Sequence, residues 1–138
     1  MYMHEIVQDI MTKDVVTIDE NETTLQAARI MANKRISSLI VLRSNNPVGI
    51  VTERDFVKKV CAKELSVSNL KVSEIMSRIQ TFADPRTPIE VAVQRMMNHK
   101  IRRLPIISHG TVVGIITVTD LAKYLRTALL IEGSFEEA

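Results

Sequence analysis

The sequence predicts an α/β protein (α+β in its local order) made of two units, each a short β-sheet with helices, related by a pseudo-two-fold axis. Three observations predict this class: an internal repeat, apolar runs of strand length that alternate with helical periodicity, and a length of 138 residues. A chain of this length is the size of about one ordinary domain, so a duplication leaves about 60 residues for each unit.

The internal repeat keeps a spacing of 65 residues over most of the chain. Three stretches match at this spacing: 10–11 with 75–76, 31–36 with 96–101, and 49–55 with 114–120. The match slips by one residue only in the stretch around Thr17 and Thr81, as a loop insertion would cause. A spacing held over so many residues indicates a duplicated unit rather than one irregular domain.

Both repeats predict the same order of elements. A short helical start is followed by an extended piece, an amphipathic helix, two apolar strands joined by a turn, and a final helix. In the first repeat we expect these elements at 7–11, 15–18, 25–32, 39–42, 48–51 and 56–60. In the second repeat we expect them at 72–76, 80–82, 89–97, 104–107, 112–116 and 121–131. Turn residues at 44–47 and 108–110 leave connections of three or four residues, which predict an antiparallel hairpin in each repeat.

The predicted domains are residues 7–62 and 72–131, joined by a linker at 63–71. A unit of about 60 residues buries too little apolar surface to be stable on its own. We therefore expect the two sheets to bury their apolar faces against each other, which gives a disc with pseudo-two-fold symmetry.

The composition argues against several classes of protein. The formal net charge is only +2 and aromatic residues make up 4% of the chain, so nucleic-acid binding is not indicated. No apolar run reaches the roughly 18 residues of a membrane span. The lone Cys61 falls in a helical stretch, where a small buried residue is expected, and the three histidines lack metal-ligand spacing. These features predict a cytoplasmic protein without a membrane segment or a metal site.

One motif with chemical potential occurs in both repeats. Gly-Ile-Val-Thr-x-x-Asp places Thr52 and Asp55 where a strand passes into a helix, and Gly-Ile-Ile-Thr-x-x-Asp does the same for Thr117 and Asp120. A hydroxyl at this junction can donate to a phosphate, and a carboxylate can accept the two hydroxyls of a ribose. The alternative is a capping box, in which both side chains satisfy only backbone donors. The motif alone does not separate a nucleotide site from a helix cap.

The combination of motifs resembles a tandem pair of cystathionine β-synthase (CBS) domains, a Bateman module. The resemblance rests on Ile-Met, Val-x-Thr, an amphipathic helix ending in Met, Arg-Leu-Pro-Ile-Ile, and Gly-x-x-Thr-x-x-Asp, and it covers nearly the whole chain. It implies a non-catalytic sensor that binds an adenosine-containing ligand (AMP, ADP, ATP, S-adenosylmethionine or NAD) in clefts between the two units. It also implies a homodimer and a regulated partner protein.

The resemblance implies two clefts, each of which draws on both repeats. One cleft would use Thr52 and Asp55 for phosphate and ribose, Ile79, Gln80 and Pro105 around the base, and Arg102 and Arg103 near the phosphates. The other would use Thr117 and Asp120, with Val15, Val16 and Ile40 around the base and Ser37 and Ser38 in place of the arginines. Two guanidinium groups bind phosphate bidentately, whereas two hydroxyls supply neutral hydrogen bonds. We therefore expect the first cleft to bind the more highly charged ligand, and to bind it more tightly.

Two other functions compete with this interpretation. Asp55 or Asp120 could act as a general base in a nucleotide-processing enzyme, although the sequence supplies no further acid, nucleophile or metal ligand beside them. The chain could also be a structural or DNA-associated regulator with vestigial clefts, although its modest charge argues against DNA contact. Leu125, Leu129 and Leu130 of the last helix either form a dimer contact or pack against the amino-terminal helix of the same chain.

Overall fold

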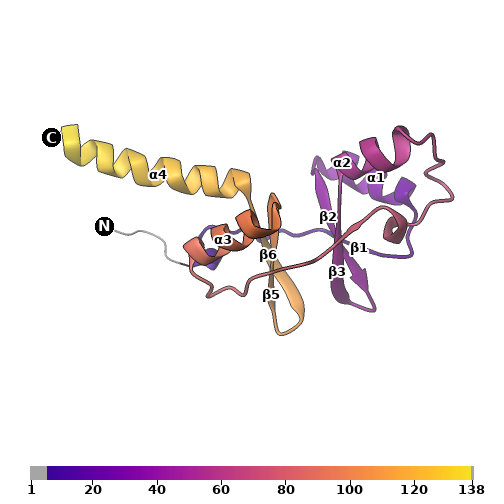
Figure 1. Cartoon of the computed structure of the whole chain (residues 1–138), viewed down its shortest axis with the longest axis horizontal. Helices are drawn as coiled ribbons and strands as arrows, with labels where there is room; N and C mark the ends of the chain where they lie inside the picture. Colours follow the sequence, from indigo (N-terminus) through magenta and orange to yellow (C-terminus); the bar gives the residue numbers. More distant parts are fainter. Residues whose placement is uncertain (1–5, 138) are drawn as a thin grey trace. The chain divides into compact units, whose positions relative to one another are not determined.

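The computed structural model describes residues 6–137, with side chains described for residues 6–130 (Figure 1). The chain forms two compact units, which we name by their strands. The β1–β4 unit comprises Val15–Ile79, and the β5–β6 unit comprises the described parts of Met1–Asp14 and Gln80–Ala138. Two short helical starts, η1 (Val7–Asp9) and η3 (Val72–Glu74), are therefore exchanged. Each belongs to the unit that holds the strands of the other repeat.

The β1–β4 unit contains a four-stranded sheet in the order β1-β2-β3-β4. Its strands are β1 (Thr17–Asp19), β2 (Ser38–Arg43), β3 (Asn46–Thr52) and β4 (Ser77–Arg78). β1 runs parallel to β2, and α1 (Thr24–Lys34) provides the crossover that a parallel pair requires. β3 is antiparallel to both β2 and β4. It leads directly into α2 (Glu53–Asp55) and η2 (Phe56–Cys61), which form one continuous helical segment.

The β5–β6 unit repeats this plan with fewer regular strands. It contains the hairpin of β5 (Arg103–Ser108) and β6 (Thr111–Thr117), the helix α3 (Ile89–His99) before it, and α4 (Val118–Glu137) after it. A parallel bridge of Ala83 with Ile106 and an antiparallel bridge of Thr12 with Ile115 take the places of β1 and β4. The mixed α/β class is confirmed.

One substitution between the repeats explains why the second unit lacks a full first strand. In the β1–β4 unit the backbone N–H of Ile40 donates to the carbonyl of Val16 at 3.1 Å, which extends the parallel pairing beyond β1. Pro105 occupies the corresponding position of β5 and has no N–H to donate. The extended segment beside β5 therefore keeps only its bridge at Ala83.

Both hairpins turn in two residues, so the predicted connection of three or four residues is wrong in length. Ser44 and Asn45 have φ values of 49° and 68°, and His109 and Gly110 have values of 52° and 77°. Two successive positive φ angles match the right-handed twist of antiparallel strands. The predicted pairing is correct, but the strands continue closer to the turn than the sequence suggested.

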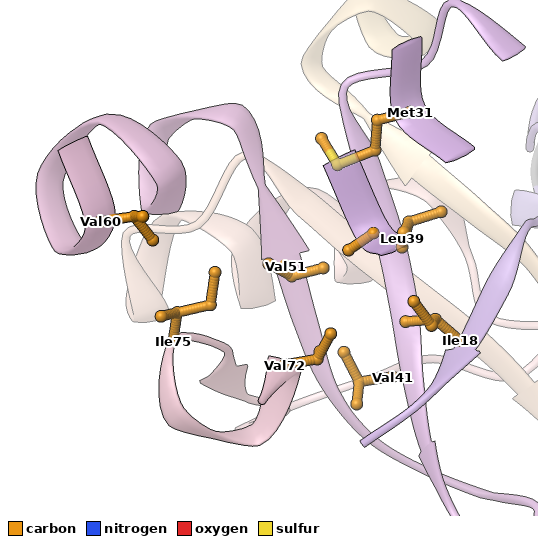
Figure 2. Close-up of a cluster of buried hydrophobic side chains, with 9 residues drawn as sticks. Ile18, Met31, Leu39, Val41, Val51, Val60, Val72 and Ile75 are labelled. Carbon is orange, nitrogen blue, oxygen red and sulfur yellow. The ribbon is translucent and has the colours of Figure 1, made fainter. Parts of the chain in front are cut away.

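Each unit has its own apolar core. In the β1–β4 unit, side chains from the sheet, α1, η2 and η3 form one cluster: Ile18, Ala27, Met31, Leu39, Val41, Val51, Val60, Val72 and Ile75 (Figure 2). Val72 and Ile75 come from the second repeat. The β5–β6 unit buries Val7 of the first repeat in the same way, together with Ala83, Ala92, Met96, Leu104, Ile106 and Ile116. The exchanged helical starts are thus part of the two cores.

The segment at 63–71 also packs against its unit. The hydroxyl of Thr24, which is fully buried, donates to the carbonyl of Val67 at 3.0 Å, and the Thr24 N–H donates to the carbonyl of Leu70 at 2.7 Å. Cys61, just before this segment, is exposed, so the expectation of a buried thiol is wrong. The chain between the repeats therefore closes over the first turn of α1.

α4 begins before and ends after the helix predicted at 121–131. Figure 1 shows this yellow helix leaving the end of β6 and extending away from the β5–β6 hairpin. Leu125, Leu129 and Leu130 are 57%, 58% and 62% exposed. Packing of these leucines against the amino-terminal helix of the same chain is therefore wrong for the described residues. Within those residues, no helix has the length and apolar character needed to cross a membrane.

Candidate functional site

The repeated Thr-x-x-Asp motif forms a reciprocal cap in both units. In the β1–β4 unit the Asp55 N–H donates to Thr52 Oγ1 at 3.3 Å, and the Thr52 N–H donates to Asp55 Oδ2 at 2.8 Å. In the β5–β6 unit the same two bonds measure 3.2 and 2.9 Å between Thr117 and Asp120. Each threonine hydroxyl also donates to Oδ2 of its aspartate. The capping box is present in both repeats, and it uses Oδ2 of each carboxylate.

The second oxygen of Asp55 is held by a lysine. Lys59 Nζ lies 3.0 Å from Asp55 Oδ1, one helical turn further along the segment 53–61. The same ammonium donates to the carbonyl of Ile75 at 2.8 Å. The Asp55 side chain is only 10% exposed and that of Lys59 is 38% exposed. This ion pair fastens the motif of the first repeat to the exchanged start of the second.

The second oxygen of Asp120 has a neutral partner instead. The hydroxyl of Thr12 lies 3.1 Å from Asp120 Oδ1 and 3.3 Å from Oδ2, and donates to them. Thr12 belongs to the exchanged start of the first repeat, so the motif is again fastened to the other repeat. The position that corresponds to Lys59 is Tyr124. A hollow of about 210 Å³ lies beside Asp120, lined also by Ile10, Lys123, Tyr124 and Thr127.

The glycine of each motif is required by the same exchange. A Cβ added to Gly49 would lie 2.6 Å from Met76 Sδ and 2.9 Å from the Ser77 carbonyl oxygen. A Cβ added to Gly114 would lie 2.5 Å from Met11 Sδ and 3.0 Å from the carbonyl oxygen of Thr12. The repeated Ile-Met and Gly-x-x-Thr-x-x-Asp motifs therefore meet in space, each glycine beside the methionine of the other repeat.

Within each unit, the predicted serines and arginines lie beside a motif threonine. Ser38 pairs with Thr52 across β2 and β3, and the carbonyl of Ser37 accepts from the Glu53 N–H at 3.1 Å. In the β5–β6 unit Arg103 pairs with Thr117, and the carbonyl of Arg102 accepts from the Val118 N–H at 3.1 Å. Directly paired residues project from the same face of a hairpin. Each unit thus brings together one motif and one pair of strand-start residues.

The two predicted clefts combine these groups differently, because each takes its motif from one unit and its strand-start residues from the other. Val15, Val16 and Ile40 lie in the β1–β4 unit, as does Ile79, whose N–H donates to the carbonyl of Val48 at 3.0 Å. Gln80 and Pro105 lie in the β5–β6 unit. The grouping of these residues into two clefts stays a prediction.

Sequence reasoning missed two residues that contact the motif aspartates, Lys59 and Thr12. Lys59 could have been found, since a lysine four residues after an aspartate in a helix faces it. Thr12 carries no such signal, because its contact with Asp120 depends on the exchange between the repeats. Among the described residues, no group of three or more His, Cys, Asp or Glu side chains is arranged to hold a metal ion.

The fold and its repeated motif define a class of proteins in which two copies of a small α/β unit exchange their amino-terminal segments. The sequence profile of the CBS domain matches residues 7–62 and 72–127, so this chain belongs to the CBS-domain family as a tandem pair. It is similar to the CBS domain-containing protein YhcV of Bacillus subtilis, with 34% identity over 84% of this chain and 82% of that protein. As a CBS pair, the chain is a regulatory module.

Two further proteins are similar to this chain, one of them an enzyme and the other a solved structure with bound ligands. The chain is 37% identical to part of a homoserine O-acetyltransferase of Methanococcus vannielii, over 85% of this chain but only 24% of that protein. The solved CBS domain pair of protein MJ0100 is in complex with 5′-methylthioadenosine and S-adenosyl-L-methionine. It matches with a TM-score of 0.77 and 28% identity over 89% of this chain and 97% of that one.

Proposed function

We propose that this CBS pair is a regulatory module that senses an adenosine nucleotide (AMP, ADP or ATP) or S-adenosylmethionine. The observation that carries the proposal is the MJ0100 pair, which has the same fold and is in complex with two adenosyl compounds. The chemistry of the motif supports it. A carboxylate has about four acceptor positions, and the described contacts of Asp55 use three of them. A ribose hydroxyl can therefore bind Asp55 without breaking the cap.

The proposed sites are the two groups of residues predicted from the sequence. In the first, Thr52 and Asp55 act with Ile79, Gln80, Arg102, Arg103 and Pro105. In the second, Thr117 and Asp120 act with Val15, Val16, Ser37, Ser38 and Ile40. The first site takes the more highly phosphorylated ligand, because guanidinium groups form charge-assisted bonds with phosphate. Regulation then requires that the ligand bind two conformational states of the pair with different affinity. The regulated protein is a partner that interacts differently with these two states.

Thermal-shift measurements with AMP, ADP, ATP, S-adenosylmethionine and NAD test the proposal. A ligand that binds only the folded chain raises Tm by mass action. Asp55→Ala and Asp120→Ala assign the sites, provided that dissociation constants are compared at a temperature where each variant is folded, since each change also removes a cap. No shift with any of these compounds at millimolar concentration would contradict the proposal.

Two alternatives have direct tests. For the nucleotide-processing enzyme, incubation with ATP followed by chromatography decides: the regulatory module returns ATP unchanged, and formation of ADP or AMP would favour the enzyme. The acetyltransferase name belongs to a relative about four times the length of the matched part. For the DNA-associated regulator, salt-dependent retention on a DNA column would favour this function. The formal net charge of only +2 argues against it.

We also propose that the pair forms a homodimer in the cytoplasm, as expected from the resemblance and the composition. The exposed leucines of α4 support a contact between copies, since three large apolar side chains on one helix are costly to leave in water. Sedimentation equilibrium measures the mass directly. A monomer at all concentrations would contradict this part of the proposal.

A further inference from the structure

The two motif aspartates differ in local charge. Asp55 is paired with the ammonium of Lys59, 3.0 Å from Oδ1, and the pair is neutral as a whole. The described donors to Asp120 are uncharged groups of Thr12 and Thr117. Lys123 lines the hollow beside Asp120, and the ion pair between Lys59 and Asp55 has no counterpart at Tyr124, which is uncharged. The carboxylate charge of Asp120 is therefore not offset by the residue four positions further along the helix, as that of Asp55 is.

A single position of the repeat causes this difference. Lys59 and Tyr124 each stand four residues after their motif aspartate, 65 residues apart. The contacts with Asp55 and with the Ile75 carbonyl use two of the three N–H donors of the lysine. With 38% of its side chain exposed, Lys59 keeps a third donor for solvent or for a ligand at Asp55. Tyr124 has no charge to offer at the corresponding place.

We infer that Lys59 is a specificity-determining residue, which adapts the Asp55 side to an adenosine ligand with phosphate, whereas Tyr124 leaves the Asp120 side to an adenosyl ligand without phosphate. This inference rests on the proposed function. The phosphate of a nucleotide lies a few bonds from the ribose hydroxyls, so a carboxylate that binds the ribose repels the phosphate unless a cation offsets its charge. Lys59 supplies that cation, and the Asp120 side suits a neutral or positively charged adenosyl compound.

The test is the ratio of affinities for ATP and adenosine, measured by isothermal titration calorimetry on the full chain. The Asp55 side is isolated by Asp120→Ala, and Lys59→Met and Lys59→Arg are made in that background. Lys59→Met should weaken ATP by about tenfold and adenosine by no more than about twofold, as expected for loss of one partly exposed charge near the phosphate. Lys59→Arg should retain the ratio, because it retains the charge.

A gain of preference for ATP is tested at Asp120. In an Asp55→Ala background, Tyr124→Lys should raise the preference for ATP over adenosine by several-fold. Equal weakening of ATP and adenosine by Lys59→Met would overturn the inference, because a residue that only fastens η3 to the motif affects both ligands alike. If the unmodified chain binds none of adenosine, AMP, ADP, ATP and S-adenosylmethionine, the proposed function itself fails. If it binds both ATP and adenosine and the ratio does not respond to position 59 or 124, only the inference fails.

Discussion

Gly49→Ala tests whether the exchanged segment packs against the motif as closely as the structure shows. The new Cβ would lie 2.9 Å from the Ser77 carbonyl oxygen, whereas ordinary contacts begin near 3.4 Å. That carbonyl belongs to β4, which is held by pairing of Gly49 with Arg78 and by the bond from the Ile79 N–H to Val48 at 3.0 Å. The backbone cannot move away without stretching these bonds.

The expected loss of unfolding free energy is about 1–2 kcal/mol. Overpacking in a filled interior costs about 1–3 kcal/mol, and replacing glycine returns about 0.4–1 kcal/mol by restricting the unfolded chain. In urea denaturation followed by circular dichroism, the midpoint should fall by about 1 M with an unchanged slope. Gly114→Ala is the matched variant in the other unit and should lose a similar amount, since its Cβ would meet Met11 and Thr12. Unchanged midpoints for both variants would refute the packing argument.

Three further predictions concern separate parts of the fold. Thr24→Val should cost about 0.5–1.5 kcal/mol of unfolding free energy, because the hydroxyl bond to the Val67 carbonyl is lost while the Leu25 N–H still donates to that carbonyl; chemical denaturation measures this, and a neutral change would contradict the role given to segment 63–71. Leu129→Glu should lower the mass seen in sedimentation equilibrium while leaving the far-ultraviolet circular dichroism unchanged; a retained dimer would place the contact elsewhere. Cys61 should react with a thiol reagent in the folded state at a rate close to that of a free thiol, and protection until unfolding would contradict its exposure.

Much of the fold could be predicted from the sequence because its signals are local. Strand and helix periodicity placed both hairpins and both amphipathic helices, and the repeat showed that one plan is used twice. The unit boundaries are not a local property. Val7 and Val72 look like the start of their own repeats, yet each is buried in the core that holds the strands of the other. Contacts between residues far apart in the chain express this exchange, among them the packing of Met76 on Gly49 and of Met11 on Gly114.

The candidate site was predictable in part for the same reason. The capping box of Thr52 and Asp55 is a local arrangement and was recognised as one of two alternatives. The carboxylate's second partner is local only in the first repeat, where Lys59 follows by one turn. In the second repeat it is Thr12, which lies 108 residues away in the chain. A contact over that separation leaves no trace in spacing or periodicity.

The central claim is that the repeated aspartates bind an adenosine-containing ligand. Isothermal titration calorimetry with ATP and with S-adenosylmethionine tests it most directly, on the unmodified chain and on the variant that carries both Asp55→Ala and Asp120→Ala. The account predicts saturable binding of at least one compound by the unmodified chain, and none by the double variant while its circular dichroism remains that of a folded protein. Equal binding by both proteins, or no binding by the unmodified chain, would contradict the claim.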